Sequence, residues 1–263
     1  MKNIFRKIRY KLIEGNNIKK YLKYAVGEIF LVVIGILFAL SINNWNESRK
    51  TNDRLKASLQ ELKIELLADN VRLNEFLIHL KKVDIDGQYL QDFTNDEIEG
   101  ISTVKLRKAI YNTGMLLTFE KNKTAYENIT VSGDIKYLLD IKLKQELAHF
   151  YSDQSWGQTY HDAVIMKSFY EYLSYIHKFT KPGVLRSFYK AEMGQKTKKK
   201  LQEMFAKKGD LIDWSSLKND VEFKFLIDKV QVNRFIQFSM YESSKEKSIN
   251  ILKMIDNELK NNR

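Results

Sequence analysis

The feature that most constrains this chain is an apolar run of eighteen residues, Ala25 to Ile42, which contains a single charge, Glu28. As an α-helix rising about 1.5 Å per residue, the run is roughly 27 Å long, close to the thickness of a bilayer's hydrocarbon core. Lipid offers the backbone no hydrogen-bonding partners, so a lone spanning segment is stable there only as a helix. The sequence therefore predicts a transmembrane anchor over residues 24–44, which includes Ala25, Ile29, Gly35, Ala39 and Ile42.

The distribution of charge predicts the orientation of this anchor. Residues 1–23 form a basic segment with eight Lys or Arg and one acid, Glu14. Fewer bases follow the span closely, so the positive-inside rule places the N-terminus in the cytoplasm. The sequence thus predicts a single-pass protein of the inner membrane, with residues 45–263 as a periplasmic domain.

Two other interpretations of the apolar run are open at this point. The triplet Ala39-Leu40-Ser41 has the small residues of a signal-peptidase site, but the basic region before it is too long for a signal peptide. A buried helix of a soluble protein is the second alternative, and the absence of a polar face from Ile29 to Leu40 argues against it. A retained anchor fits the sequence best.

Several blocks of the chain also resemble a known family. Residues 24–29, 31–37 and 41–47 read YAVGEI, LVVIGIL and SINNWNE, residues 5–9 read FRKIR, and residues 124–129 read TAYENI. These blocks resemble the hallmarks of an uncharacterised family of single-span membrane proteins from flavobacteria and their relatives. The anchor block is the specific part, and the last third of the chain is similar only in general character. The resemblance implies a retained anchor and an extracytoplasmic domain, and it implies no activity because the family has none assigned.

Composition favours an all-α fold and excludes some chemistry. The chain has one proline, 29% charged residues and no cysteine, so it has no disulfide, no cysteine-ligated zinc and no thiol catalysis. Most of the net charge of +11 precedes the span, where it is expected to contact anionic headgroups of the lipid bilayer. We expect no nucleic acid among the partners.

Apolar spacing predicts three long helices, at about 45–83, 141–179 and 221–259, which form an elongated bundle. The first continues the anchor and carries a heptad seam that Asp69 interrupts. This seam begins with Leu55, Leu59, Leu62 and Leu66. It could serve a homodimeric coiled coil or be covered by helices of the same chain. Within the anchor, Gly35 and Ala39 form a small-xxx-small pair that would let two copies pack closely.

Shorter elements are predicted between the long helices. The apolar pattern weakens from Asp84 to Ser102, and within it Asn95-Asp96 with Gly100 indicates a loop, followed by a helix near 104–112 that Gly114 closes. A further helix begins at Thr124, where Thr124 and Glu127 have the spacing of a capping box. A basic stretch over 184–209 is expected to be solvated or to meet an anionic polymer or headgroup.

The middle of the second long helix breaks the apolar pattern. Its seam passes through Gln154, Gly157 and His161, which are small or polar. One interpretation is a kink, or a place where another helix leaves room. The other is a ligand-sensing pocket formed by these residues with Trp156 and Tyr160.

No motif for catalysis or for metal binding is present. The four histidines include no pair at i, i+4, and the chain has no HExxH, GxSxG or glycine-rich phosphate loop. We therefore expect no enzymatic activity, no metal and no cofactor. The leading hypothesis is a membrane-anchored helical scaffold or accessory subunit that contacts other envelope proteins. The alternative is a sensory or ligand-binding module that signals through the anchor, and an envelope hydrolase is third.

Overall fold

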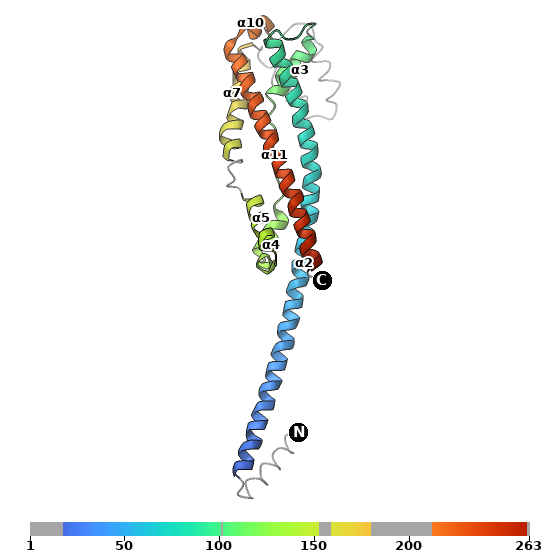
Figure 1. Cartoon of the computed structure of the whole chain (residues 1–263). Helices are drawn as coiled ribbons and strands as arrows, with labels where there is room; N and C mark the ends of the chain where they lie inside the picture. The colour runs from blue at the N-terminus through green and yellow to red at the C-terminus, as the bar shows by residue number, and fades with distance from the viewer. Residues whose placement is uncertain (1–17, 101, 153–158, 180–211, 262–263) are drawn as a thin grey trace, which may run out of the picture. The chain divides into compact units, whose positions relative to one another are not determined.

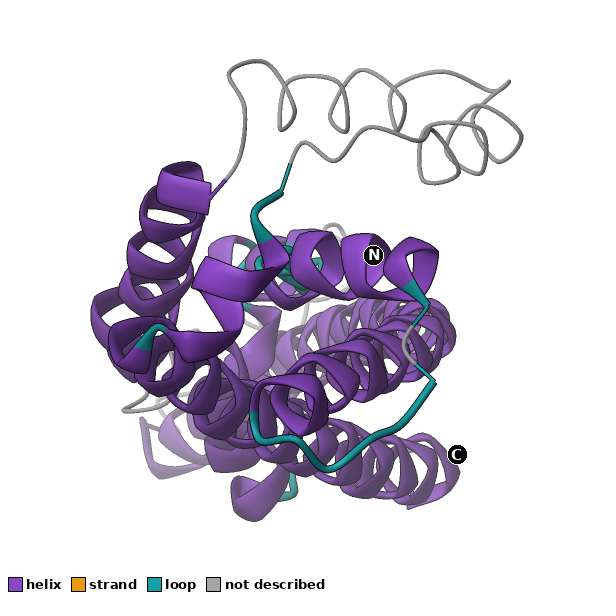
Figure 2. Cartoon of the chain, turned by 90° about the horizontal axis from the view of Figure 1, so that it is seen from above, coloured by secondary structure: helices purple, strands orange, loops and turns teal. Residues whose placement is uncertain are grey.

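The computed structural model describes residues 18–100, 102–152, 159–179 and 212–261. Within these ranges every regular element is a helix, as the all-α prediction requires (Figure 2). The chain forms two compact units, Met1–Ala57 and Ser58–Arg263. The basic stretch 184–209, like most of the N-terminal basic segment, lies outside the described residues.

Helix α2 runs from Ile18 to Thr94 and contains both the predicted anchor and the first predicted rod (Figure 1). The prediction that the rod ends near Val83 is wrong, whereas the loop predicted at Asn95, Asp96 and Gly100 is confirmed. Leu90 and Phe93 are also buried, so the apolar seam continues for three further turns. The loop begins at Asn95, and its residues Asp96 and Gly100 have positive φ angles of 63° and 68°.

In the first unit, the apolar stretch of α2 is exposed on every side. The part of the chain that the structure describes contains one helix long and apolar enough to cross a membrane, and none of its most apolar window is buried. Gly35 has no atom within 4 Å of the position that a Cβ would take. Glu28 is partly buried. The predicted span is therefore a continuous helix whose apolar side chains have no protein cover.

In the second unit, α2 packs against a long antiparallel helix, α11, which runs from Val221 to Asn261. Lys63 Nζ lies 2.6 Å from Asp256 Oδ1, and far along both helices Gln91 donates to Asp228 over 3.4 Å. The bounds of α11 agree with the predicted 221–259. Asp220 accepts a hydrogen bond of 2.7 Å from the amide of Phe223 and so caps its N-terminus.

The second predicted rod, 141–179, is not one continuous helix. It consists of α5 (Ile141–Tyr151), the π-helical turn η2 (His161–Ile165), α7 (Met166–Ile176) and the short 3-10 helix η3 (His177–Phe179). Helix α5 ends because Ser152 is extended.

The shorter helices are α3 (Thr103–Thr113), α4 (Thr124–Val131), the 3-10 helix η1 (Asp134–Tyr137) and α10 (Trp214–Asn219). Helix α3 ends at Gly114, as predicted. The predicted capping box of α4 is wrong, because Glu65 of α2 accepts the Ala125 amide over 2.9 Å and takes the place of a local cap. Thr124 Oγ1 bonds to Asn122 Oδ1 instead.

The largest core cluster joins the C-terminal part of α2 to α3, α7 and the first half of α11. Its central side chains include Leu90, Ile110, Phe169, Tyr172, Phe223 and Ile227. The four leucines that begin the predicted seam, Leu55, Leu59, Leu62 and Leu66, are all buried in the single chain. This burial favours the intramolecular use of the seam over a coiled coil with a second copy.

Candidate functional site

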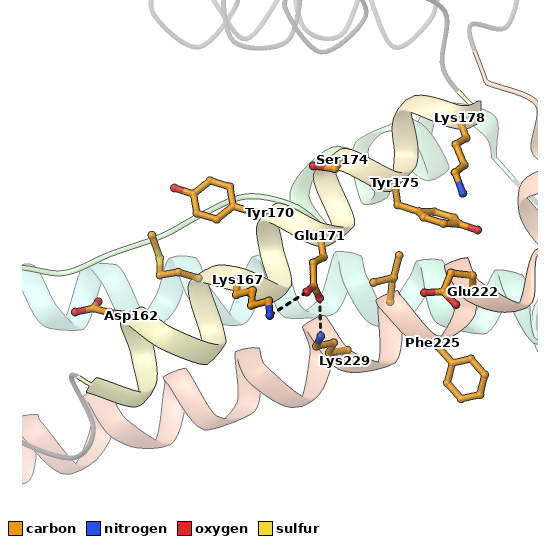
Figure 3. A pocket seen from close by; sticks show the side chains of 12 residues that line it. Asp162, Lys167, Tyr170, Glu171, Ser174, Tyr175, Lys178, Glu222, Phe225 and Lys229 are labelled. Atoms are coloured by element: carbon orange, nitrogen blue, oxygen red, sulfur yellow. Dashed lines mark hydrogen bonds and ion pairs between the residues drawn. The ribbon is translucent and has the colours of Figure 1, made fainter.

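A groove between α7 and the N-terminal half of α11 is the first candidate site (Figure 3). Its volume is about 780 Å³. Glu171 of α7 lies 2.5 Å from Lys229 Nζ of α11 and 3.9 Å from Lys167 Nζ. The hydrogen bond from Lys229 holds the pKa of Glu171 below its usual range. The Glu171–Lys229 ion pair ties the two walls of the groove together, whereas Lys167 lies on the same helix as Glu171.

At the other end of the groove, Tyr175 joins α7 to the start of α11. Its hydroxyl donates to Asp220 Oδ1 over 2.8 Å. Burial, with the bond to Asp220, raises the pKa of Tyr175 to about 12, so the phenol keeps its proton at neutral pH. Since Asp220 also caps α11, this contact serves the structure of the groove.

Beside the groove, α11 exposes a stripe of large apolar side chains. Phe225 is 68% exposed and Phe235 is 70% exposed. The same side of α11 also carries Val221 and Val232, at spacings of three, four and seven residues. Exposed apolar patches of this kind often mark interaction sites. We call Val221, Phe225, Val232 and Phe235 the α11 stripe.

A second apolar stripe lies on α2, outside the leucine seam. Ile64, Val71, Ile78 and Ile85 recur every seven residues, and all four are exposed. We call these residues the α2 stripe. The leucine seam is the stronger pattern in this helix, and it masks the stripe in the sequence. The strict seven-residue recurrence of β-branched residues is the signal that could have found it.

Between α2 and α11 lies a segment without regular secondary structure, residues 114–123, which we call the strap. Arg234 of α11 is fully buried beside it and donates to the carbonyls of Thr113 and Met115 over 3.3 and 2.8 Å. Its guanidinium lies 4.3 Å from the ring centre of Phe169. Burial lowers the pKa of Arg234 to about 10. The arginine thus joins the start of the strap to the core.

One turn further along α11, Gln237 continues this network. Its Nε2 donates to the carbonyl of Leu117 over 2.6 Å and lies 3.1 Å from His161 Nε2, while its Oε1 accepts from Arg234 over 3.2 Å. His161 Nδ1 lies 3.1 Å from Asp162 Oδ1. Gln237 therefore uses both amide protons and its oxygen to link the strap with the π-helical turn.

Helix α2 holds the far end of the strap. Asp69, the residue that interrupts the leucine seam, accepts the Asn122 amide over 2.7 Å and pairs with Arg72 over 2.7 Å. Arg72 also donates to the carbonyl of Glu120 over 3.1 Å. The polar side chain at an expected core position is thus used to hold a backbone segment.

The predicted pocket can be followed only in part. Gln154, Trp156 and Gly157 lie outside the described residues. Tyr160 packs against the main core cluster, and His161 is buried beside Gln237. His161 also lines a cavity of about 620 Å³ between α5, the strap and α11. Helix α5 ends before these residues, at Tyr151, and the choice between a kink and a pocket stays a prediction.

A metal site was not expected, and the residues that the structure describes hold no group of three or more His, Cys, Asp or Glu that could bind one. Over the residues that it describes, the structure defines an all-α protein with one candidate membrane span, a strapped helical domain and two exposed apolar stripes. A family model described as a family of unknown function, DUF6090, matches residues 28–190, and the chain belongs to this family. The match covers most of the span and extends beyond α7. No curated protein and no solved structure matched the chain.

Proposed function

We propose that this protein is a single-pass protein of the bacterial inner membrane whose periplasmic helical domain acts as a scaffold or accessory subunit. It works by contact with other envelope proteins and performs no reaction of its own. The observation that carries the proposal is the α11 stripe, in which Phe225 and Phe235 each expose about 70% of their surface and Phe225 also lines a groove rimmed by both signs of charge.

The membrane anchor is supported by the free-energy cost of exposing the apolar side chains of α2 to water. Full exposure of a Leu, Ile, Val or Phe side chain forgoes about 1.5–3 kcal/mol relative to burial. The stretch from Ala25 to Ile42 presents such side chains on all faces. A bilayer covers them, and the eight bases before the span keep the N-terminus on the cytoplasmic side.

The docking role is supported by the type of residue on the α11 stripe. Buried aromatic anchors contribute much of the binding energy in protein interfaces, and charged residues at the rim set specificity more than affinity. Phe225 and Phe235 supply two anchors. Lys167, Glu171 and Lys229 supply a rim of mixed charge. The partner that fits is an amphipathic helix with an aromatic or aliphatic face and charges of both signs beside it.

A site-specific photo-crosslinker tests this role in living cells. Benzoylphenylalanine placed at Phe225 is expected to give one discrete crosslinked product with another envelope protein. The control position, Lys142, is exposed on α5 and belongs to neither apolar stripe, and it is expected to give none. The substitution Phe235→Ser should abolish the crosslink from position 225. A crosslink only within the same chain, or equal products from both positions, would contradict the proposal.

The α2 stripe supports a second contact, with another copy of this chain. β-Branched residues at one heptad position are typical of parallel two-stranded coiled coils, and two copies in one membrane run parallel. The second core position of this heptad, three residues after each of the first three stripe residues, is occupied by Leu67, Asn74 and Lys81, of which only the first is apolar. The pairing is therefore weaker than that of a full leucine zipper and suits a reversible dimer.

A further inference from the structure

The cavity beside His161 has the chemistry of a binding site for a small molecule. Its volume, about 620 Å³, is within the range of 300–1,000 Å³ that is common for such sites. Its walls come from the strap, the end of α5, η2 and the middle of α11. Three distant parts of the sequence therefore meet there, the strap, the α5 and η2 region, and α11, and the Arg234–Gln237 network fixes the position of the strap among them.

The inner wall of this cavity is apolar and aromatic. Phe150 is buried, and Phe119, Ile236 and Met240 are partly buried around it. Phe119 packs edge-on against Tyr241 with ring centres 6.1 Å apart, and its amide donates to the Tyr241 hydroxyl over 3.2 Å. The wall is thus preformed and presents flat ring surfaces to an occupant.

The polar side chains of the cavity are basic or neutral. Of the described residues that line it, none is Asp or Glu, whereas two are lysines and two are histidines. Lys121 Nζ donates to the carbonyl of Phe150 and lies 4.3 Å from the centre of that ring, so its ammonium is fixed at the wall. Lys247 and His149 are exposed at the mouth. Hydroxyl groups of Ser239, Ser243 and Ser244 add donors.

We propose that this cavity binds an organic anion, a carboxylate or a phosphate ester carried on an apolar or aromatic body. The apolar wall takes the body, and the anionic group meets Lys121, Lys247 and the serine hydroxyls. Hydrogen bonds between charged and hydroxyl groups are strong in such a partly enclosed site. This inference does not rest on protein docking at the α11 stripe, although Phe235 belongs to both surfaces.

Equilibrium dialysis of the full chain in non-ionic micelles tests the inference. Naphthyl phosphate and naphthoate represent the two anionic groups, and naphthalenemethanol is the neutral control of the same body. We expect saturable binding of at least one anion and binding of the alcohol at least tenfold weaker. The relative affinity of the two anions distinguishes a phosphate ester from a carboxylate as the natural group.

Two charge reversals on α11 make the test specific. Lys247→Glu is expected to weaken anion binding at least tenfold, because it replaces an attraction at the mouth with a repulsion. Lys253→Glu makes the same change on the same helix at an exposed residue outside the cavity, and it should alter binding less than twofold. Circular dichroism checks that both variants are folded. Absence of saturable binding to the wild type, equal loss in both variants, or equal affinity for the alcohol would each overturn the inference.

Discussion

Asp69 gives the sharpest test of how the helical domain is held together. From the sequence pattern alone, Asp69 interrupts an apolar seam, and replacing it with a small apolar residue would be expected to leave the stability of the fold unchanged. In the structure it accepts the Asn122 amide and pairs with Arg72. Replacing it with alanine should therefore free one end of the strap.

The size of the effect follows from these two contacts. A hydrogen bond to a charged group contributes about 1.5–3 kcal/mol, and the pair with Arg72, whose side chain is half exposed, adds at most about 1 kcal/mol. The better helix propensity of alanine returns about 0.5 kcal/mol. We expect Asp69→Ala to lower the free energy of unfolding by about 1–3.5 kcal/mol.

Urea unfolding of the full chain in non-ionic micelles, followed by tryptophan fluorescence, measures this loss. Trp214 reports on the core, where its ring meets Phe93 edge-on with centres 6.1 Å apart. Asp69→Asn is the matched control, because its amide oxygen still accepts from Asn122, and it should lose about 1 kcal/mol less than the alanine variant. An alanine variant as stable as the wild type would refute the role given to Asp69.

Three further results are expected. Ile78→Lys should change the free energy of unfolding by less than about 0.5 kcal/mol, because the side chain is exposed. The same substitution should reduce the fraction of dimer measured by light scattering. A monomeric wild type would contradict this prediction. Glu171 has a lowered folded-state pKa, so its ion pair stabilises the fold above the unfolded pKa near 4.5 and is lost as pH falls through the folded value. As the pH is lowered from 6 to about 3, the free energy of unfolding measured in urea should therefore fall more for the wild type than for Lys229→Met. Identical pH profiles would argue against the ion pair. Gly114→Ala would place a Cβ 2.9 Å from the ring of buried Tyr172 and should cost about 1–3 kcal/mol in urea unfolding; an unchanged midpoint would show that the ring yields freely.

Elements whose stability depends on local pattern could be predicted from the sequence. The bounds of α11 follow from its apolar spacing and from the capping Asp220, and the apolar stretch of α2 follows from its composition alone. The end of α2 was placed too early, because the residues after Val83 are polar at many positions. Their register still buries Leu90 and Phe93 against distant segments, which periodicity within a single helix does not reveal.

The strap and the cavity depend on contacts between distant parts of the chain. Glu65 caps α4 from another helix, so the local capping box was a misleading signal. Arg234 and Gln237 look like ordinary surface residues in the sequence, and only the packing of α11 against the strap buries them. The cavity that His161 lines could not be predicted from the sequence, because Lys121, Lys247 and Tyr241 come from segments that no sequence spacing connects.

The central claim is that residues 25–42 cross the inner membrane and leave the helical domain in the periplasm. The chain has no cysteine, so single cysteines can be introduced at Asn3 and at exposed Ser102. Cells with a permeabilised outer membrane are then treated with a membrane-impermeant maleimide. The account predicts labelling of Ser102→Cys in intact cells and of Asn3→Cys only after lysis. Labelling of position 3 alone in intact cells, or a mature N-terminus beyond Ser41, would contradict it.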